Sequence, residues 1–130
     1  MSLEENKAII RSLYEAFNKH NPDLLDDLMA PDFVDAPNTP FELRGLESYK
    51  KFEAMFVKGF PDYHDTIEGI IAEGARFGFL GRLRAHTGEW KFLGITFAPT
   101  GKKIAWTAVN IFRIVSGKIV ESQSVTCWIS

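Results

Sequence analysis

The stretch VNIFRIVSGKIVESQSVT, Val109–Thr126, predicts a β-hairpin whose second strand changes character along its length. Apolar residues dominate as far as Val120, and Ser116-Gly117 is typical of a tight turn between two strands. Asn110 interrupts the apolar run near its start. Small polar residues then follow Val120 in close order, namely Ser122, Gln123, Ser124 and Thr126. Two strands that are expected to fill a core therefore carry a row of neutral polar groups.

The register of this hairpin decides which polar groups share a face, because a slip of one residue moves every side chain to the other face. With a two-residue loop, Asn110 lies opposite Gln123. With a three-residue loop, it lies opposite Ser124. We favour the second register, because Gly117 suits the left-handed position of a bulged turn.

In the favoured register, one face of the hairpin combines apolar walls with a few neutral polar groups, as ligand pockets usually do. It carries Ile104, Trp106, Ala108, Asn110, Phe112, Val120, Ser122, Ser124, Thr126 and Trp128. The opposite face carries Thr107, Val109, Ile111 and Val125, an apolar patch that a second copy of the chain would bury. The alternative is a smaller patch, since Arg113, Glu121 and Gln123 interrupt it.

The rest of the chain predicts helices first and strands afterwards. Apolar residues at helical spacing indicate helices over residues 3–19, 23–29 and 45–60. Strands are predicted over residues 32–37, 63–72, 75–87, 102–115 and 118–129, with Gly78 and Gly81 marking a bend or bulge. The aromatic-rich connection 88–101 is equally compatible with a lid, a strand pair or a dimer arm.

This order of elements predicts one α+β domain over residues 1–130. Three N-terminal helices are expected to cover one face of a strongly curved, mostly antiparallel sheet of about four to six strands. A curved sheet closed by helices leaves a conical cavity, which is the natural place for a site.

Composition and charge exclude several classes of function. The chain has 130 residues, 45% of them hydrophobic, and a net charge of −2 with no basic stripe, so we expect no nucleic-acid partner. A single cysteine, Cys127, excludes an internal disulfide and a cysteine-based zinc cluster. The three histidines show no metal-binding spacing, so no metal or other cofactor is expected. No apolar run is long enough for a membrane span and no signal peptide is visible, which predicts a cytoplasmic protein.

Several motifs together resemble one protein family. They are FPD at residues 60–62, PTGK at 99–102, IFRI at 111–114 and GKIVE at 117–121, in an order of elements that fits from Glu4 to Val125. The chain resembles the SnoaL-like branch of the nuclear-transport-factor-2-like superfamily, which includes polyketide cyclases and ester cyclases. The resemblance implies a cone-shaped α+β barrel with an apolar pocket, usually dimeric through the outer face of the sheet.

The resemblance also implies a chemistry. The cyclases close a ring by a cofactor-free intramolecular aldol reaction, in which an Asp on the last strand acts as general acid/base and a His on the preceding strand assists it. In this chain, the Asp position falls on Ser124 and the His position on Asn110. Neither side chain can remove a carbon-bound proton near neutral pH, so the chain departs from the cyclase pattern at both positions.

Two other residues are candidates for the base. Asp35 lies near the position where the related ketosteroid isomerases place their catalytic Asp, although Ala36 fits that position equally well. An Asp facing an apolar cavity would have a raised pKa, whereas a turn-capping Asp beside Pro37 would not. His86 ends a predicted strand and could pair with Glu89, or it is simply a surface histidine.

Aromatic side chains are candidates for the wall of the cavity. Trp90, Trp106 and Trp128 could donate their indole N–H groups to a ligand carbonyl, or they could simply fill the core. Tyr14, Phe56 and Phe112 are further candidates for ligand contact. His20 and His64 lie next to predicted helix ends, and both are expected at the surface.

Two functions remain open on the sequence alone. The first is a cofactor-free cyclase, isomerase or hydrolase that acts on a hydrophobic carbonyl compound, with Asp35 or His86 as the base and Asn110 as a hydrogen-bond donor. The second is a non-catalytic protein that binds a small hydrophobic molecule through Asn110, Ser124 and the tryptophans. They differ in whether a carboxylate or an imidazole reaches the cavity.

Overall fold

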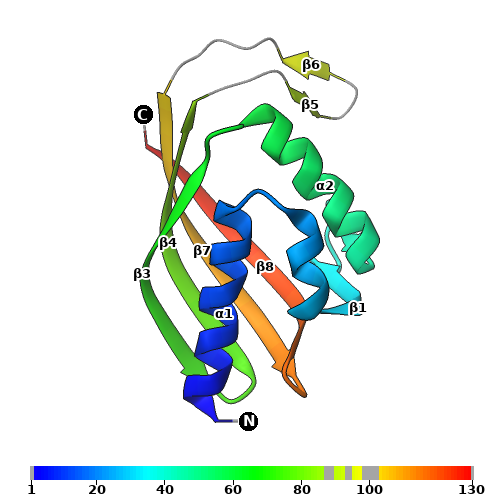
Figure 1. Cartoon of the computed structure of the whole chain (residues 1–130), viewed down its shortest axis with the longest axis vertical. Helices are drawn as coiled ribbons and strands as arrows, with labels where there is room; N and C mark the ends of the chain where they lie inside the picture. The colour runs from blue at the N-terminus through cyan, green and yellow to red at the C-terminus, as the bar shows by residue number, and fades with distance from the viewer. Residues whose placement is uncertain (1, 87–89, 93–94, 98–102, 130) are drawn as a thin grey trace.

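A computed structural model describes residues 2–86, 90–92, 95–97 and 103–129 of the chain. A six-stranded sheet in the order β2-β1-β8-β7-β4-β3 curves around the helices, which lie together on one of its sides (Figure 1). The elements are α1 (Leu3–Asn18), the 3-10 helix η1 (Pro22–Asp27), β1 (Met29–Asp35), β2 (Leu43–Arg44), α2 (Leu46–Gly59), β3 (His64–Glu73), β4 (Arg76–His86), β5 (Trp90–Phe92), β6 (Ile95–Phe97), β7 (Lys103–Val115) and β8 (Lys118–Ile129). The predicted α+β class is confirmed.

Helix α1 follows from capping and from an apolar stripe. The Ser2 hydroxyl accepts the Glu5 amide at 3.1 Å, and two acidic residues in the first turn suit the positive end of the helix dipole. The buried side of the helix carries Ile10, Leu13, Tyr14, Ala16 and Phe17. The helix ends before His20, whose positive φ of 55° cannot continue an α-helix.

The expectation of three N-terminal helices needs a correction. The second segment is a 3-10 helix of six residues, which Asn21 caps by accepting the Asp23 amide at 3.1 Å. Strands β1 and β2 then precede α2, so the third helix is not part of an N-terminal group. A short segment between Pro22 and β1 has no room for a stable α-helix, which explains the tighter turn.

The β7–β8 hairpin places Asn110 opposite Ser124, as the favoured register requires, but by a different route. The loop has two residues, with φ of 51° at Ser116 and 77° at Gly117, as in the mirror-image turns that suit hairpins. The register then shifts between Arg113 and Ile114, where β8 has one extra residue, Val120. A bulge in the strand, and not a longer loop, therefore brings the polar residues to the inner face.

A second bulge bends the sheet between β3 and β4. The register shifts between Ile67 and Gly69, and Gly81 lies opposite this point, where the sequence predicted a bend or bulge. A Cβ at Gly81 would collide with the Phe79 ring and would lie 2.9 Å from the Thr66 carbonyl oxygen. Glycine is therefore required for the close approach of the two strands.

Part of the 88–101 connection is a strand pair. Strands β5 and β6 are antiparallel, with Trp90 opposite Phe97 and Phe92 opposite Ile95, and β5 lies on the side nearer to α2 (Figure 1). The hydrophobic core lies between the helices and the inner face of the six-stranded sheet. Its largest fully buried side chains are Phe33, Phe77, Phe79, Ile10, Leu13, Leu25, Met29 and Ile119. Within the described residues, no helix is long and apolar enough to cross a membrane.

Candidate functional site

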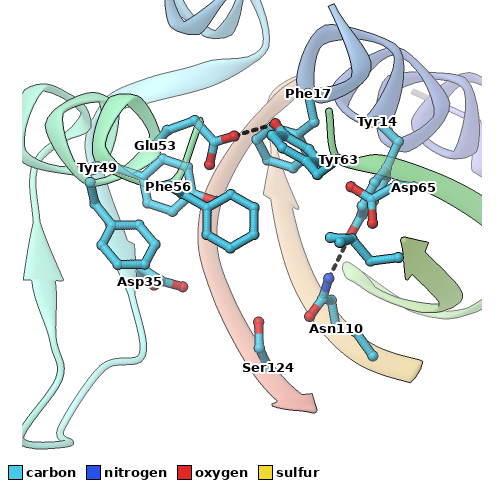
Figure 2. Close-up of a pocket in the computed structure, with 13 residues that line it drawn as sticks. Tyr14, Phe17, Asp35, Tyr49, Glu53, Phe56, Tyr63, Asp65, Asn110 and Ser124 are labelled. Carbon is cyan, nitrogen blue, oxygen red and sulfur yellow. Dashed lines mark hydrogen bonds between the residues drawn. The ribbon is translucent and has the colours of Figure 1, made fainter. Parts of the chain in front are cut away.

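A pocket of about 280 Å³ opens between the helices and the inner face of the sheet. Five apolar side chains and eight polar ones surround it, so its lining is more polar than the sequence led us to expect. The lining residues are Tyr14, Phe17, Asp35, Tyr49, Phe52, Glu53, Phe56, Tyr63, Asp65, Leu83, Ala108, Asn110 and Ser124. The lining side chains come from α1, α2, the residues before β3 and five strands of the sheet, and they converge on one pocket (Figure 2).

Asp35 brings a carboxylate to the pocket from the end of β1. Parallel pairing with β8 sets Asp35 beside Ser122, whose hydroxyl donates to Asp35 Oδ1 at 2.5 Å. Burial raises the pKa of Asp35, and the hydrogen bonds from Ser122 and the Ala36 amide oppose this effect only in part. Asp35 is therefore a stronger base than a surface aspartate, and it is already oriented by a neighbour.

Asn110 and Tyr14 form a hydrogen-bonded pair on the wall formed by α1 and the sheet. The Asn110 amide Nδ2 donates to the Tyr14 hydroxyl (Figure 2). The Tyr14 ring stacks on Phe79 with 3.8 Å between centroids. Burial raises the pKa of Tyr14 well above its usual value, so its hydroxyl stays protonated. Because that hydroxyl accepts from Asn110, its own hydrogen is available for a ligand oxygen.

Glu53 and Tyr63 form a second buried pair between α2 and β3. The Tyr63 hydroxyl donates to Glu53 Oε1 at 2.5 Å, and Glu53 is only 8% exposed. Burial raises the pKa of Glu53, and the Tyr63 hydrogen bond lowers it by less. The ring of His20 stacks on Tyr63, and its Nε2 lies 2.8 Å from the Tyr63 carbonyl oxygen. His20 is thus half-buried against the core, and its expected surface position is corrected.

Asp65 contributes a third carboxyl group from β3. The Asn18 side chain clamps its backbone, accepting the Asp65 amide at 2.7 Å and donating to the Asp65 carbonyl oxygen at 3.0 Å. Burial, followed by the negative charge of Glu53, raises the pKa of Asp65 to about 7. A carboxyl group with this pKa exchanges a proton readily at neutral pH.

The charges around the pocket have one sign. No Lys, Arg or His is among the described residues that line it, whereas three carboxyl groups are. In the described part of the chain these carboxyl groups are not gathered closely enough to hold a metal ion. The lining therefore disfavours an anionic ligand and suits a neutral or cationic one.

The structure brings together five of the residues singled out from the sequence, because Asp35, Asn110, Ser124, Tyr14 and Phe56 all line the pocket. Phe112 is instead buried in the core, with its ring edge-on to Tyr14. The side chains of His86, Trp90, Trp106 and Trp128 lie outside the described residues. Their roles, like those of the five pocket residues, stay predictions.

Sequence reasoning missed Glu53, Asp65, Tyr49 and Tyr63, which also line the pocket. A signal for Glu53 exists, since it lies four residues after Tyr49 and three before Phe56, on the apolar stripe of α2. A charged residue on such a stripe must be paired or must face a cavity. The signal for Asp65 is weaker. It lies two residues before Ile67, and both side chains are therefore on the face of β3 that turns inward.

Comparison with known proteins shows the family. A model of the SnoaL-like polyketide cyclase family matches residues 7–126. The solved structure of AclR, a proposed hydroxylase from Streptomyces galilaeus, is similar with 27% identity and a TM-score of 0.82, over 97% of this chain and 91% of AclR. IdmH, a proposed polyketide cyclase from Streptomyces antibioticus, is similar with 28% identity and a TM-score of 0.77, over 93% of this chain and 91% of IdmH.

A more distant likeness extends to another chemistry. An epoxide hydrolase of the LEH-like type from M. tuberculosis has a TM-score of 0.71 but only 13% identity, over 95% of this chain and 84% of the hydrolase, and shows the shared fold alone.

No curated protein matches the chain. The fold and the pocket define a cone-shaped α+β protein of the kind that handles small molecules. The chain belongs to the SnoaL-like polyketide cyclase family.

Proposed function

We propose that the protein is a cofactor-free acid/base enzyme of the cyclase or isomerase type, acting on a neutral, hydrophobic carbonyl compound. The observation that carries the proposal is that a carboxylate, Asp35, and a hydrogen-bond donor pair, Asn110–Tyr14, line one pocket. The family's usual acid/base positions hold Asn110 and Ser124 here, so the base must come from elsewhere in the lining. Asp35 meets that need, because burial raises its pKa.

In the proposed reaction, the Asp35 carboxylate removes a proton from the carbon next to the substrate carbonyl. Electron density moves onto the carbonyl oxygen, which accepts the hydrogen bond from Tyr14 while Asn110 polarises that hydroxyl. The resulting enolate then takes back a proton at another carbon, which is an isomerisation. Alternatively, its carbon attacks a second carbonyl of the same molecule, which closes a ring, and the new alkoxide takes up the proton.

Asp65 supports this proposal as a second group that can exchange a proton. Its pKa of about 7 means that a good part of the population carries a proton at neutral pH. Figure 2 shows Asp65 on the same side of the pocket as Tyr14, with Asp35 on the side of α2. A protonated Asp65 can thus donate a proton to the alkoxide, while the Asp35 carboxylate removes the proton from the carbon.

The proposal is tested by following deuterium uptake at the α-carbon of a neutral bicyclic ketone, 2-tetralone, by proton NMR in D₂O. The wild-type protein is expected to accelerate the exchange, and Asp35→Asn to lower that acceleration by about 10²–10⁴-fold. Asp32→Asn is the matched control, because Asp32 lies on the same strand but is exposed. An equal loss in both variants, or none in either, contradicts the assignment of Asp35.

The alternative is a non-catalytic protein that binds a hydrophobic ligand, which the polar replacements Asn110 and Ser124 favour. The same NMR samples distinguish the two functions. If 2-tetralone resonances broaden or shift on binding, and Asn110→Ala abolishes this, while the wild type leaves the exchange rate unchanged, binding without catalysis becomes the answer. Acceleration by the wild type excludes this alternative.

We also propose that a second copy of the chain covers the outer face of the sheet. Large apolar side chains are exposed there, with Ile71 at 77% and Leu80, Val109 and Ile111 each above 40%. Ile71, Val109 and Ile111 line a hollow of about 740 Å³, and its rim carries both signs of charge, with Glu73 against Arg76 and Arg113. A patch with both signs at its rim can pair with its own copy about a two-fold axis.

The dimer is tested by light scattering after size exclusion. Wild-type protein is expected at twice the mass of the chain, and Ile111→Lys at the mass of one chain, because a charge would be buried without a partner. Leu24→Lys is the control, since Leu24 is an exposed leucine on η1, away from this face. A monomeric wild type contradicts the proposal.

A further inference from the structure

A second hollow adjoins the pocket beneath the loop between β1 and β2. It measures about 410 Å³ and is lined by Asp35, Ala36, Pro40, Phe41, Glu42, Leu43 and Phe52. Asp35 and Phe52 also line the inner pocket, so the two hollows share these two side chains. They differ in character, because the loop hollow is mainly apolar whereas the inner pocket carries most of the polar groups.

We infer that the hollow under residues 36–43 is the subsite for the hydrophobic tail of the ligand whose carbonyl end occupies the inner pocket. This inference rests on the proposed function. It names the substrate class more closely: a neutral ketone with an extended apolar chain or ring attached close to the reacting carbon. Such a molecule would pass Asp35, which the two hollows share.

Size supports the inference. The inner pocket, at about 280 Å³, is smaller than most ligand sites, which range over about 300–1,000 Å³. A molecule larger than a small ketone therefore needs additional space. The hollow under the loop supplies it at the side where the base is located, with Pro40, Phe41, Leu43 and Phe52 as apolar walls.

The loop is built as a fixed wall. The Thr39 hydroxyl donates to the Ala36 carbonyl oxygen at 2.8 Å and accepts the Phe41 amide at 3.2 Å. The Glu42 carboxylate accepts hydrogen bonds from the Asn38 amide at 3.0 Å and from Arg44 Nε at 2.9 Å. These bonds hold Phe41 in place although its side chain is 61% exposed, and ordering such a loop in advance lowers the cost of binding.

The backbone conformation of the loop also supports the tail subsite. Ala36 and Asn38 both have positive φ, 49° and 62°, and for alanine this region is unfavourable. The Ala36 amide donates to the Ser122 carbonyl oxygen at 2.9 Å, which continues the β1–β8 pairing and holds the strained residue. The turn at Ala36 carries the loop away from the sheet immediately after Asp35, and the hollow lies in the space that this turn leaves.

The inference is tested with a series of neutral 2-alkanones, from 2-pentanone to 2-nonanone, titrated into ¹⁵N-labelled protein. Each methylene that enters the hollow is expected to strengthen wild-type binding by about fourfold, or about 10²-fold over the series. The short ketone should shift the amide resonances of Asp35 and Asn110. The longer ones should in addition shift those of Phe41 and Leu43.

The decisive variant is Phe41→Ala, which removes an exposed side chain and so leaves the fold intact. Its affinity for 2-pentanone is expected to lie within twofold of the wild-type affinity. The increase in affinity from 2-pentanone to 2-nonanone is expected to be about tenfold smaller than in the wild type. Phe41→Leu should restore most of this gain. Leu24→Ala, a change at an exposed leucine on η1, should behave as the wild type.

The outcomes separate this inference from the proposed function. If the gain with chain length is the same in Phe41→Ala as in the wild type, the tail subsite is wrong, whatever Asp35 does. If Phe41→Ala loses the gain but Asp35→Asn leaves deuterium exchange unchanged, the subsite is supported and the acid/base assignment is wrong. If no alkanone of the series binds, the ligand class is wrong, and the subsite inference is overturned with it.

Discussion

The inner and outer faces of the sheet each carry residues that are unusual for their side. On the inner face, β7 and β8 present Asn110, Ser122 and Ser124 toward the helices. On the outer face, the alternate residues Val109 and Ile111 are apolar and exposed. Because alternate residues of one strand point to opposite sides, the same segments supply both faces. The polar groups inside underlie the proposed site, and the apolar groups outside underlie the proposed dimer surface.

The largest expected loss of stability comes from removing a large side chain from the core on the inner face. Phe79 is 1% exposed and stacks on Tyr14, so Phe79→Ala is expected to lower the free energy of unfolding by about 3–5 kcal/mol. The next residue, Leu80, is 41% exposed on the outer face of a single chain, so in the monomeric Ile111→Lys background Leu80→Ala should cost less than about 1 kcal/mol. Urea denaturation measures both. Similar costs for the two neighbours would show that the two faces are equally packed.

Two glycines of β4 repeat the comparison at the level of the backbone. A methyl group at Gly81 meets the Phe79 ring and the Thr66 carbonyl oxygen, so Gly81→Ala should cost about 1–3 kcal/mol. At Gly78, the same change meets only the exposed side chain of Ile71, which can move aside. Gly78→Ala should therefore shift the denaturation midpoint little. A larger effect at Gly78 than at Gly81 would contradict this view of the bulge.

Polar pairs inside and outside should also differ. Tyr63→Phe removes the donor to buried Glu53, which leaves a carboxyl oxygen unsatisfied and should cost about 1–3 kcal/mol. On the outer face, Arg82 pairs with Glu68 at 2.8 Å, but both side chains are well exposed. Arg82→Ala should therefore cost about 0–1 kcal/mol. Chemical denaturation of the two variants at one pH compares the pairs directly.

A pH dependence that belongs to the inner face extends the comparison. The pKa of Asp65 rises from 3.8 to about 7 on folding, so the folded protein binds more protons than the unfolded chain between these values. Stability is therefore expected to fall as the pH rises through this range. Asp65→Asn should weaken this fall, seen in thermal melting between pH 5 and 8, whereas the exposed-carboxylate control Asp32→Asn should not. Parallel curves for Asp65→Asn and the wild type would show that Asp65 is solvated.

Much of the fold follows from local pattern in the sequence. Apolar spacing predicts both ends of α1 and of α2 to within one residue. Alternation of apolar and polar residues, together with turn residues, predicts β3, β4, β7 and β8. The pairing of Asn110 with Ser124 was also predicted, although the bulge at Val120 that produces it was not. A bulge depends on how the strand packs against the helices, and single-strand periodicity does not contain that information.

The candidate site was predicted only in part. The polar row on β7 and β8 and the carboxylate of Asp35 stand out in the sequence because they interrupt apolar or strand patterns. Glu53 and Asp65 lie 12 residues apart in an amphipathic helix and a strand, where charged residues are common on the solvent side. Their convergence depends on how α2 and β3 cross the cavity, which is a long-range contact.

The sequence by itself therefore determined the class of fold, the order of its elements, the family and the unusual polarity of the last hairpin. Local forces control these features, since capping, turn chemistry and the periodicity of apolar residues act over a few residues. Only the tertiary structure decided that Asp35, Glu53 and Asp65 share one pocket and that their pKa values rise. Burial and the interaction between charges depend on distance in space, and the curvature of the sheet sets that distance.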